Sequence, residues 1–173
     1  MPGPISIGDE APNFDLSSTE DALLMLRDEV IRTAIVVYFF ADPGSDRAQR
    51  DLDTLNRNLD ALGRRSARVL AVSPAKLDDL KKLQIERKLL FPLLHDDRNF
   101  SASYGVRPVE EGRTPDPALV VVSRRQRVLW LANPVASVDG ALPQVLKVLE
   151  GLPSGTETYQ KKVINRWIDR WVN

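Results

Sequence analysis

The sequence predicts an α/β domain with a central mixed sheet flanked by helices, plus an extra C-terminal helix. Short apolar runs rich in β-branched residues alternate with leucine-striped helical segments. Two strand–helix crossovers require parallel strands that are covered by helices. Late in the chain, two apolar runs are joined by a short polar turn, which is typical of an antiparallel hairpin.

The first half of the chain supplies the two crossovers. Residues 35–40 form a short apolar run that we interpret as a buried strand, and a Pro-Gly turn follows it. A helix is expected over residues 45–64, because four leucines recur at intervals of three or four: Leu52, Leu55, Leu59 and Leu62. A second strand is expected at residues 69–72 and a second helix at residues 77–88.

The second half of the chain completes the sheet. Residues 91–94 predict a brief extended segment, and residues 99–104 a short helix. Two antiparallel strands are expected at residues 118–122 and 128–131, and a helix at residues 139–150. After an N-terminal arm, the resulting order β-α-β-α-β-β-α is a thioredoxin-like layout.

The chain divides into a domain at residues 1–150, a linker at 151–156 and an amphipathic helix at 157–173. The apolar face of this last helix is broad, and we expect it to bind a partner through Tyr159, Val163, Trp167, Ile168 and Trp171. Packing of this helix on its own domain is the alternative, and we do not expect a membrane surface as its target.

Composition excludes several function classes. The chain of 173 residues contains no cysteine, which excludes disulfides, iron–sulfur clusters and thiolate metal sites. Basic and acidic residues both number 24, so no overall charge points to nucleic acid. We see no signal peptide or transmembrane segment and expect a cytoplasmic or organelle-matrix protein. We expect no cofactor and no metal.

Four fragments carry a resemblance to a known family. Residues 7–16, 71–74, 91–94 and 104–106 resemble, in order and spacing, landmarks of the peroxiredoxin (AhpC/TSA, redoxin) family. The resemblance covers roughly residues 5–150. It implies a peroxiredoxin-type thioredoxin fold and an activity that reduces peroxide through a thiolate.

The catalytic loop departs from that family. The resemblance implies that Ala41 stands where the family has proline, Ser45 at its hydroxyl residue and Ala48 at the peroxidatic cysteine. It also places Pro117 at the active-site arginine. Losing three of these four positions together indicates evolutionary loss of the site, so we predict no catalytic residue. The remaining Ser45 is interpreted as a helix N-cap rather than a nucleophile.

Two kinds of polar cluster invite a ligand. His95, Asp96 and Asp97 could suggest a metal site, but neighbouring residues on one loop diverge in direction, and we interpret them as solvated or capping groups. Two basic clusters could bind phosphate, and we interpret them as solvated: Arg64, Arg65 and Arg68, and Arg124, Arg125 and Arg127.

Our leading hypothesis is therefore an inactive peroxiredoxin-like protein that acts by protein–protein interaction, as a subunit or accessory factor of a larger assembly. One alternative is a small-molecule-binding module that uses the vestigial peroxide pocket. Another is an antioxidant or oxidoreductase with residual activity. The resemblance also implies a homodimer as a possible state.

Overall fold

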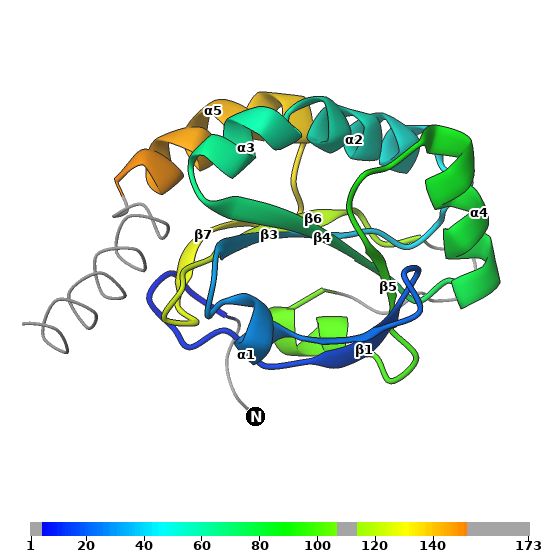
Figure 1. The fold of residues 1–173 in the computed structure, drawn as a ribbon, viewed down its shortest axis with the longest axis horizontal. Coiled ribbons are helices and arrows are strands. Elements are labelled where there is room, and N and C mark those ends of the chain that lie inside the picture. The colour runs from blue at the N-terminus through cyan, green and yellow to red at the C-terminus, as the bar shows by residue number, and fades with distance from the viewer. Residues whose placement is uncertain (1–4, 107–113, 152–173) are drawn as a thin grey trace, which may run out of the picture.

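The computed structural model describes residues 5–106 and 114–151. Within them, seven strands form one mixed sheet in the order β2-β1-β5-β4-β3-β6-β7, with helices on both faces (Figure 1). The strands are β1 (Asp15–Ser18), β2 (Leu23–Met25), β3 (Ala34–Phe39), β4 (Ala67–Ser73), β5 (Leu93–His95), β6 (Ala118–Val122) and β7 (Val128–Ala132). The helices are α1 (Leu26–Glu29), α2 (Asp46–Arg57), α3 (Leu59–Arg64), α4 (Leu77–Arg87), the 3-10 helix η1 (Phe100–Tyr104) and α5 (Val138–Glu150). This arrangement confirms the thioredoxin-like layout.

Strand β3 is the centre of the sheet, and all six of its residues are buried. It runs parallel to β4, with Val37 opposite Leu70, and antiparallel to β6, with Val37 opposite Val120. A strand that has neighbouring strands on both sides and helices over both faces is expected to be a continuous run of apolar residues. The strands expected at residues 35–40, 69–72, 118–122 and 128–131 agree with β3, β4, β6 and β7 to within about two residues.

The single long helix expected over residues 45–64 is in fact two helices, α2 and α3, which meet at Asn58. The Asn58 side-chain amide donates to the carbonyl of Thr54 at 2.7 Å, and the Asn58 backbone N–H donates to Leu55 at 3.1 Å. The side chain therefore occupies the carbonyl that a continuous helix would offer to the backbone N–H. Such competition is typical of asparagine, and the leucine pattern does not reveal it.

The expected N-terminal arm contributes two strands that the sequence did not predict. Strand β1 pairs antiparallel with β5, with Ser17 opposite His95, and β2 adds the outer edge, with Leu24 opposite Leu16. Thr19 extends this pairing, because its hydroxyl accepts the backbone N–H of Leu93 at 3.1 Å. Strand β1 has only four residues, two of them serines, and β2 has only three residues, so neither is long enough to show the apolar alternation that identifies a strand.

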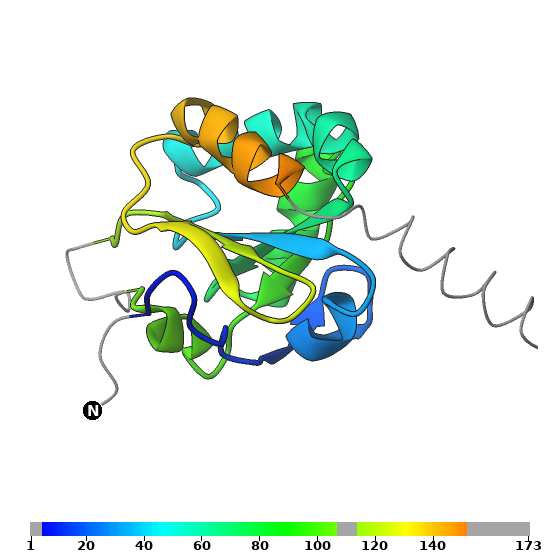
Figure 2. The ribbon, with the colours of Figure 1, turned by 90° about the vertical axis from the view of Figure 1, so that its left-hand side faces the viewer.

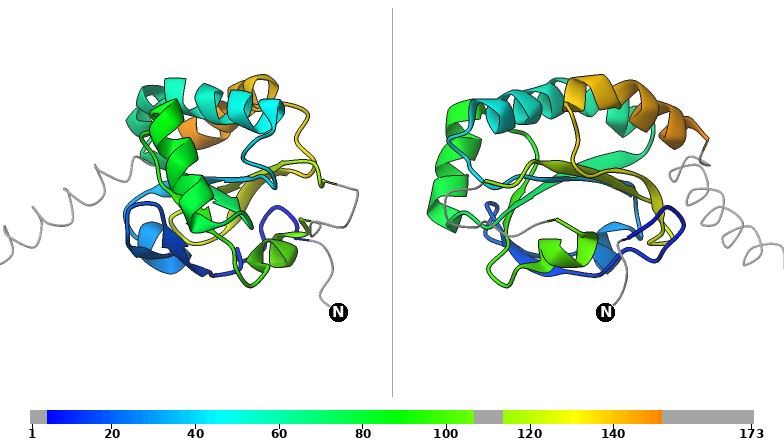
Figure 3. Two further views of the ribbon diagram at one scale, coloured as in Figure 1. Left: turned by 90° about the vertical axis from the view of Figure 1, so that its right-hand side faces the viewer. Right: turned by 180° about the vertical axis from the view of Figure 1, so that it is seen from behind.

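Two apolar layers lie on the two faces of the sheet. Helices α2, α3, α4 and α5 cover one layer, which includes Leu52, Leu62 and Leu80. Helices α1 and η1 lie against the other layer, with Leu26 and Tyr104 fully buried. Figure 2 shows the longer helices above the sheet and α1 and η1 below it, and Figure 3 shows the same layers from two further sides.

The described residues end at Gly151. The expected helix at residues 157–173 lies outside them, with its apolar face of Tyr159, Val163, Trp167, Ile168 and Trp171. Among the helices of the described part, none has the length and apolar character needed to cross a bilayer.

Candidate functional site

The four positions compared with the family's catalytic loop lie around the carboxyl end of β3. Ala41 follows this strand, and its carbonyl accepts the Ser73 hydroxyl at the end of β4, at 3.2 Å. Pro117 directly precedes β6, whose Ala118 pairs with Phe39. Ligands bind at the carboxyl ends of parallel strands in open α/β sheets, so the sequence comparison identified the expected edge of the fold.

Ser45 caps helix α2, as the sequence predicted. Its backbone is extended, and its side-chain oxygen accepts the backbone N–H of Ala48 at 3.3 Å. Asp46 in the first turn adds a favourable charge at the helix N-terminus. The hydroxyl oxygen is thus engaged in holding the helix end.

Ala48 is buried in the core, with 2% of its surface exposed. It belongs to the same apolar cluster as Phe40, Leu52 and Val135, between the first turn of α2 and the sheet. A methyl group in this environment has neither a nucleophilic atom nor contact with solvent. The residue that the sequence resemblance aligns with the family's thiolate position is therefore part of the hydrophobic core.

Next to Ala48, a buried carboxylate joins three elements that sequence reasoning did not connect. Asp51 on α2 is 5% exposed. It accepts the Tyr38 hydroxyl of β3 at 2.7 Å and the Val138 backbone N–H of α5 at 3.1 Å. The Arg47 guanidinium lies 3.7 Å from the same carboxylate and also donates to the Val135 carbonyl. Two hydrogen bonds and one nearby cation thus compensate the buried charge.

A signal for this network was present in the sequence. Tyr38 stands inside an otherwise apolar strand, and a buried tyrosine hydroxyl requires a hydrogen-bond partner. Burial, followed by the charge of Asp51, raises the pKa of Tyr38 far above its ordinary value of 10.0. The hydroxyl therefore remains a donor to Asp51 at all physiological pH values.

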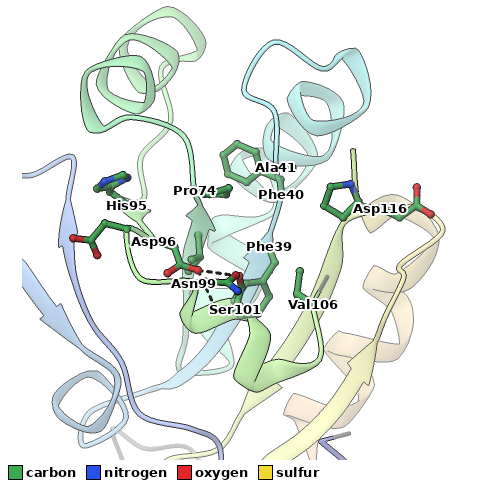
Figure 4. Close-up of a pocket in the computed structure, with 13 residues that line it drawn as sticks. Phe39, Phe40, Ala41, Pro74, His95, Asp96, Asn99, Ser101, Val106 and Asp116 are labelled. Carbon is green, nitrogen blue, oxygen red and sulfur yellow. Dashed lines mark hydrogen bonds between the residues drawn. The ribbon is translucent and has the colours of Figure 1, made fainter. Parts of the chain in front are cut away.

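A cavity of about 520 Å³ opens at the same edge of the sheet (Figure 4). Its lining comes from segments far apart in the chain: Phe39, Phe40, Ala41, Val72, Pro74, His95, Asp96, Asp97, Asn99, Ser101, Val106, Pro115 and Asp116. Ala41 is on its wall, whereas Ser45, Ala48 and Pro117 are not. The cavity thus shares Ala41 with the predicted vestigial pocket, and its lining extends from the ends of β4 and β5 to Pro115 and Asp116 before β6.

The polar cluster at residues 95–97 has structural partners. Asp96 is buried and accepts the backbone N–H groups of Phe100 and Ser101 at 2.7 and 2.9 Å, which caps η1. The His95 Nδ1 lies 2.7 Å from the Ala75 carbonyl, so this nitrogen is the donor. Asp97 pairs with Arg98 at 3.6 Å. The capping interpretation is confirmed for Asp96.

Pro117 is buried and its carbonyl accepts the Val135 N–H at 2.9 Å. In the described part of the chain the cis peptide bond is the one between Asn133 and Pro134.

Comparison with known proteins agrees with this fold. A family model described as the AhpC/TSA family matches residues 7–131. The chain is similar to the solved structure of peroxidoxin BcpB from Mycobacterium tuberculosis, with a TM-score of 0.78 and 18% identity over 86% of this chain and 98% of that one. It is also similar to a PrxQ mutant from Xylella fastidiosa, with a TM-score of 0.76 and 19% identity over the same shares. At such identities the structures show the fold alone. No curated protein matches the sequence.

The buried Tyr38 predicts a loss of stability at alkaline pH. Its pKa in the folded state lies above the ordinary 10.0, so the unfolded chain releases this proton first and unfolding becomes easier as the pH rises above about 10. Burial raises the pKa of Tyr104 in the same direction. In urea titrations between pH 10 and 11.5, Tyr38→Phe should reduce the fall in unfolding free energy by about 1.4 kcal/mol per pH unit. Tyr104→Phe is the matched variant for the second buried tyrosine. If the slope of unfolding free energy against pH is unchanged in Tyr38→Phe, the attribution of the alkaline loss to Tyr38 is wrong.

Proposed function

The chain belongs to the AhpC/TSA family, and we propose that it is a member without thiol chemistry that acts by binding a protein partner, as part of a larger assembly. The observation that carries this proposal is the burial of Ala48 at the position of the family's nucleophile. The chain has no cysteine elsewhere that could replace it. Ser45, the remaining hydroxyl at this site, caps α2.

The C-terminal segment supplies the binding face of this proposal. Two of the three tryptophans lie in the last seven residues, and tryptophan is enriched among the residues that dominate protein interfaces. On a helix, the residues of the apolar face would share one side, opposite a basic one. The pattern favours docking on a second surface over a purely solvated tail.

We expect the double variant Trp167→Ala/Trp171→Ala to lose its partner. Tagged full-length protein is captured from native extract, and the stoichiometry and size of the recovered complex are measured. The tryptophan variant and a chain ending at Ser154 should each reduce complex recovery about tenfold or more. Lys161→Ala/Arg166→Ala, which changes the polar side, should recover the same complex as the wild type. Equal recovery by all forms, or no defined complex from any, would refute the proposal.

Restoring the sulfur at Ala48 should not restore peroxide reduction. In Ala48→Cys the thiol would lie in an apolar environment, which favours its protonated and unreactive form. Steady-state peroxide consumption with dithiothreitol as reductant should stay at background. Ser45→Cys is the control. Its thiol would be half-buried at the N-terminus of α2, and iodoacetamide should alkylate it more rapidly than the thiol of Ala48→Cys. Efficient turnover by Ala48→Cys would show that the site is intact.

The cavity favours a second candidate, a small-molecule-binding module. Its described lining combines aromatic and proline side chains with the carboxylates of Asp97 and Asp116, and it includes no lysine or arginine. A ligand with an apolar body and a cationic or hydrogen-bond-donating group fits this chemistry.

A matched pair of probes tests the second candidate. We expect 2-phenylethylamine, at ten times its Kd, to raise the Tm by about 3–5 °C, and the neutral analogue 2-phenylethanol to raise it less. Ala41→Trp, which fills the cavity wall, should abolish the shift. Ala22→Trp, on the exposed turn between β1 and β2, should retain it. Equal shifts in both variants, or none in the wild type, would exclude the cavity as the binding site.

A further inference from the structure

The fold brings two separate basic clusters together at the end of the sheet where the parallel strands β3 and β4 begin. Ile35, at the start of β3, pairs with Arg68 of β4 on one side and with Val122 of β6 on the other. The residues that precede β4 and those that follow β6 therefore flank the residues that precede β3. We call this edge the arginine surface, and it comprises Arg32, Arg64, Arg65, Arg68, Arg124, Arg125 and Arg127. The left-hand end of Figure 1 shows the β6–β7 turn and the ends of α3 and α5 together.

Few carboxylates neutralise the arginine surface. Arg65 pairs with Glu150 at 2.5 Å and Arg68 with Glu29 at 2.6 Å. The other five arginines have no carboxylate within ion-pair distance in the described part of the chain. Glu10 stands opposite Arg127 in an isolated β-bridge, yet the two make no ion pair. Positive charge is therefore in excess at this edge, although the whole chain has no net charge.

Unpaired polar atoms gather at the same edge. Among the described residues, three buried side-chain atoms lack a hydrogen-bond partner: Thr33 Oγ1, Arg65 Nε and Arg124 Nε. Buried groups of this kind are rare in native proteins and call for an explanation. These atoms lie at the same end of the sheet as the arginines that have no carboxylate partner, so hydrogen-bonding groups and positive charge are both left unmatched there among the described residues.

The composition of the edge favours a protein as the missing partner. Ile31 is 66% exposed, and its carbonyl accepts the Arg124 guanidinium at 3.2 Å. An exposed apolar side chain among arginines is typical of protein interfaces, where arginine is enriched. Nucleic-acid binding usually needs a basic domain with stacking aromatic residues. A chain with equal numbers of acidic and basic residues does not fit that requirement.

We propose that the arginine surface binds an acidic segment of the partner protein, whose carboxylates pair with the unneutralised arginines. Arginine suits this role because its planar guanidinium binds a carboxylate through two parallel hydrogen bonds. This inference rests on the proposed function, since it names the chemistry of the partner. It assigns a second contact with the partner to the arginine surface, in addition to the contact proposed for the C-terminal segment.

The test measures binding of fluorescent poly-L-glutamate to the full-length protein at low ionic strength. The variant Arg125→Glu/Arg127→Glu changes two arginines whose side chains have no partner in the described structure. The control Arg50→Glu/Lys76→Glu makes the same change of charge at exposed positions on α2 and before α4, away from this edge. We expect at least tenfold weaker binding by the first variant and near-wild-type binding by the control, with equal Tm values for all three proteins.

Three outcomes would overturn the inference. Equal binding by the two variants would show that net charge alone is measured. Tighter binding of double-stranded DNA than of poly-L-glutamate would identify a nucleic-acid surface. Tighter binding of phosphatidylserine vesicles would identify a membrane surface. Because poly-L-glutamate binding does not need the C-terminal tryptophans, Trp167→Ala/Trp171→Ala should leave it unchanged. Failure of the inference is thus separate from failure of the proposed function.

Discussion

The buried carboxylate of Asp51 is the interaction on which the arrangement around β3 depends. It accepts hydrogen bonds from Tyr38 in the central strand and from the first turn of α5 at Val138, while its own helix is α2. One side chain therefore fixes three elements that are far apart in the sequence. A buried charge is tolerated where donors and a cation surround it, and Arg47 supplies that cation. The first turn of α2 is held against the sheet as a result.

Four residues at or near the start of α2 are engaged in structural contacts. Ser45 caps the helix, Arg47 bonds to the carbonyl of Val135, Ala48 fills the core and Asp51 joins the three elements. A reactive thiolate needs the opposite setting, with partial exposure and a locally positive environment. Active sites commonly sacrifice stability for reactivity. In this chain the same turn instead contributes contacts that strengthen the fold.

The sequence predicts what local patterns encode and misses what depends on distant contacts. The apolar runs of β3, β4, β6 and β7 identify their strands, and the turn before Ser45 identifies its cap. The break at Asn58 depends on one side-chain hydrogen bond, and the pairing of β1 depends on β5, which lies more than seventy residues away. The cavity and the arginine surface likewise combine segments that no sequence window contains. Asp51 is a further example. In the sequence it stands beside a leucine stripe and resembles a solvated residue, because its partners come from distant segments.

The two ends of the parallel strands differ in charge, although the chain as a whole is neutral. Carboxylates such as Asp97 and Asp116 line the cavity at the carboxyl ends, whereas arginines crowd the amino ends. Charged side chains of opposite sign at two ends of a molecule orient an approaching charged partner, and this effect weakens as salt is added. This distribution of charge does not involve the residue at position 48. The scaffold therefore offers charged surfaces on which the proposed binding function can act.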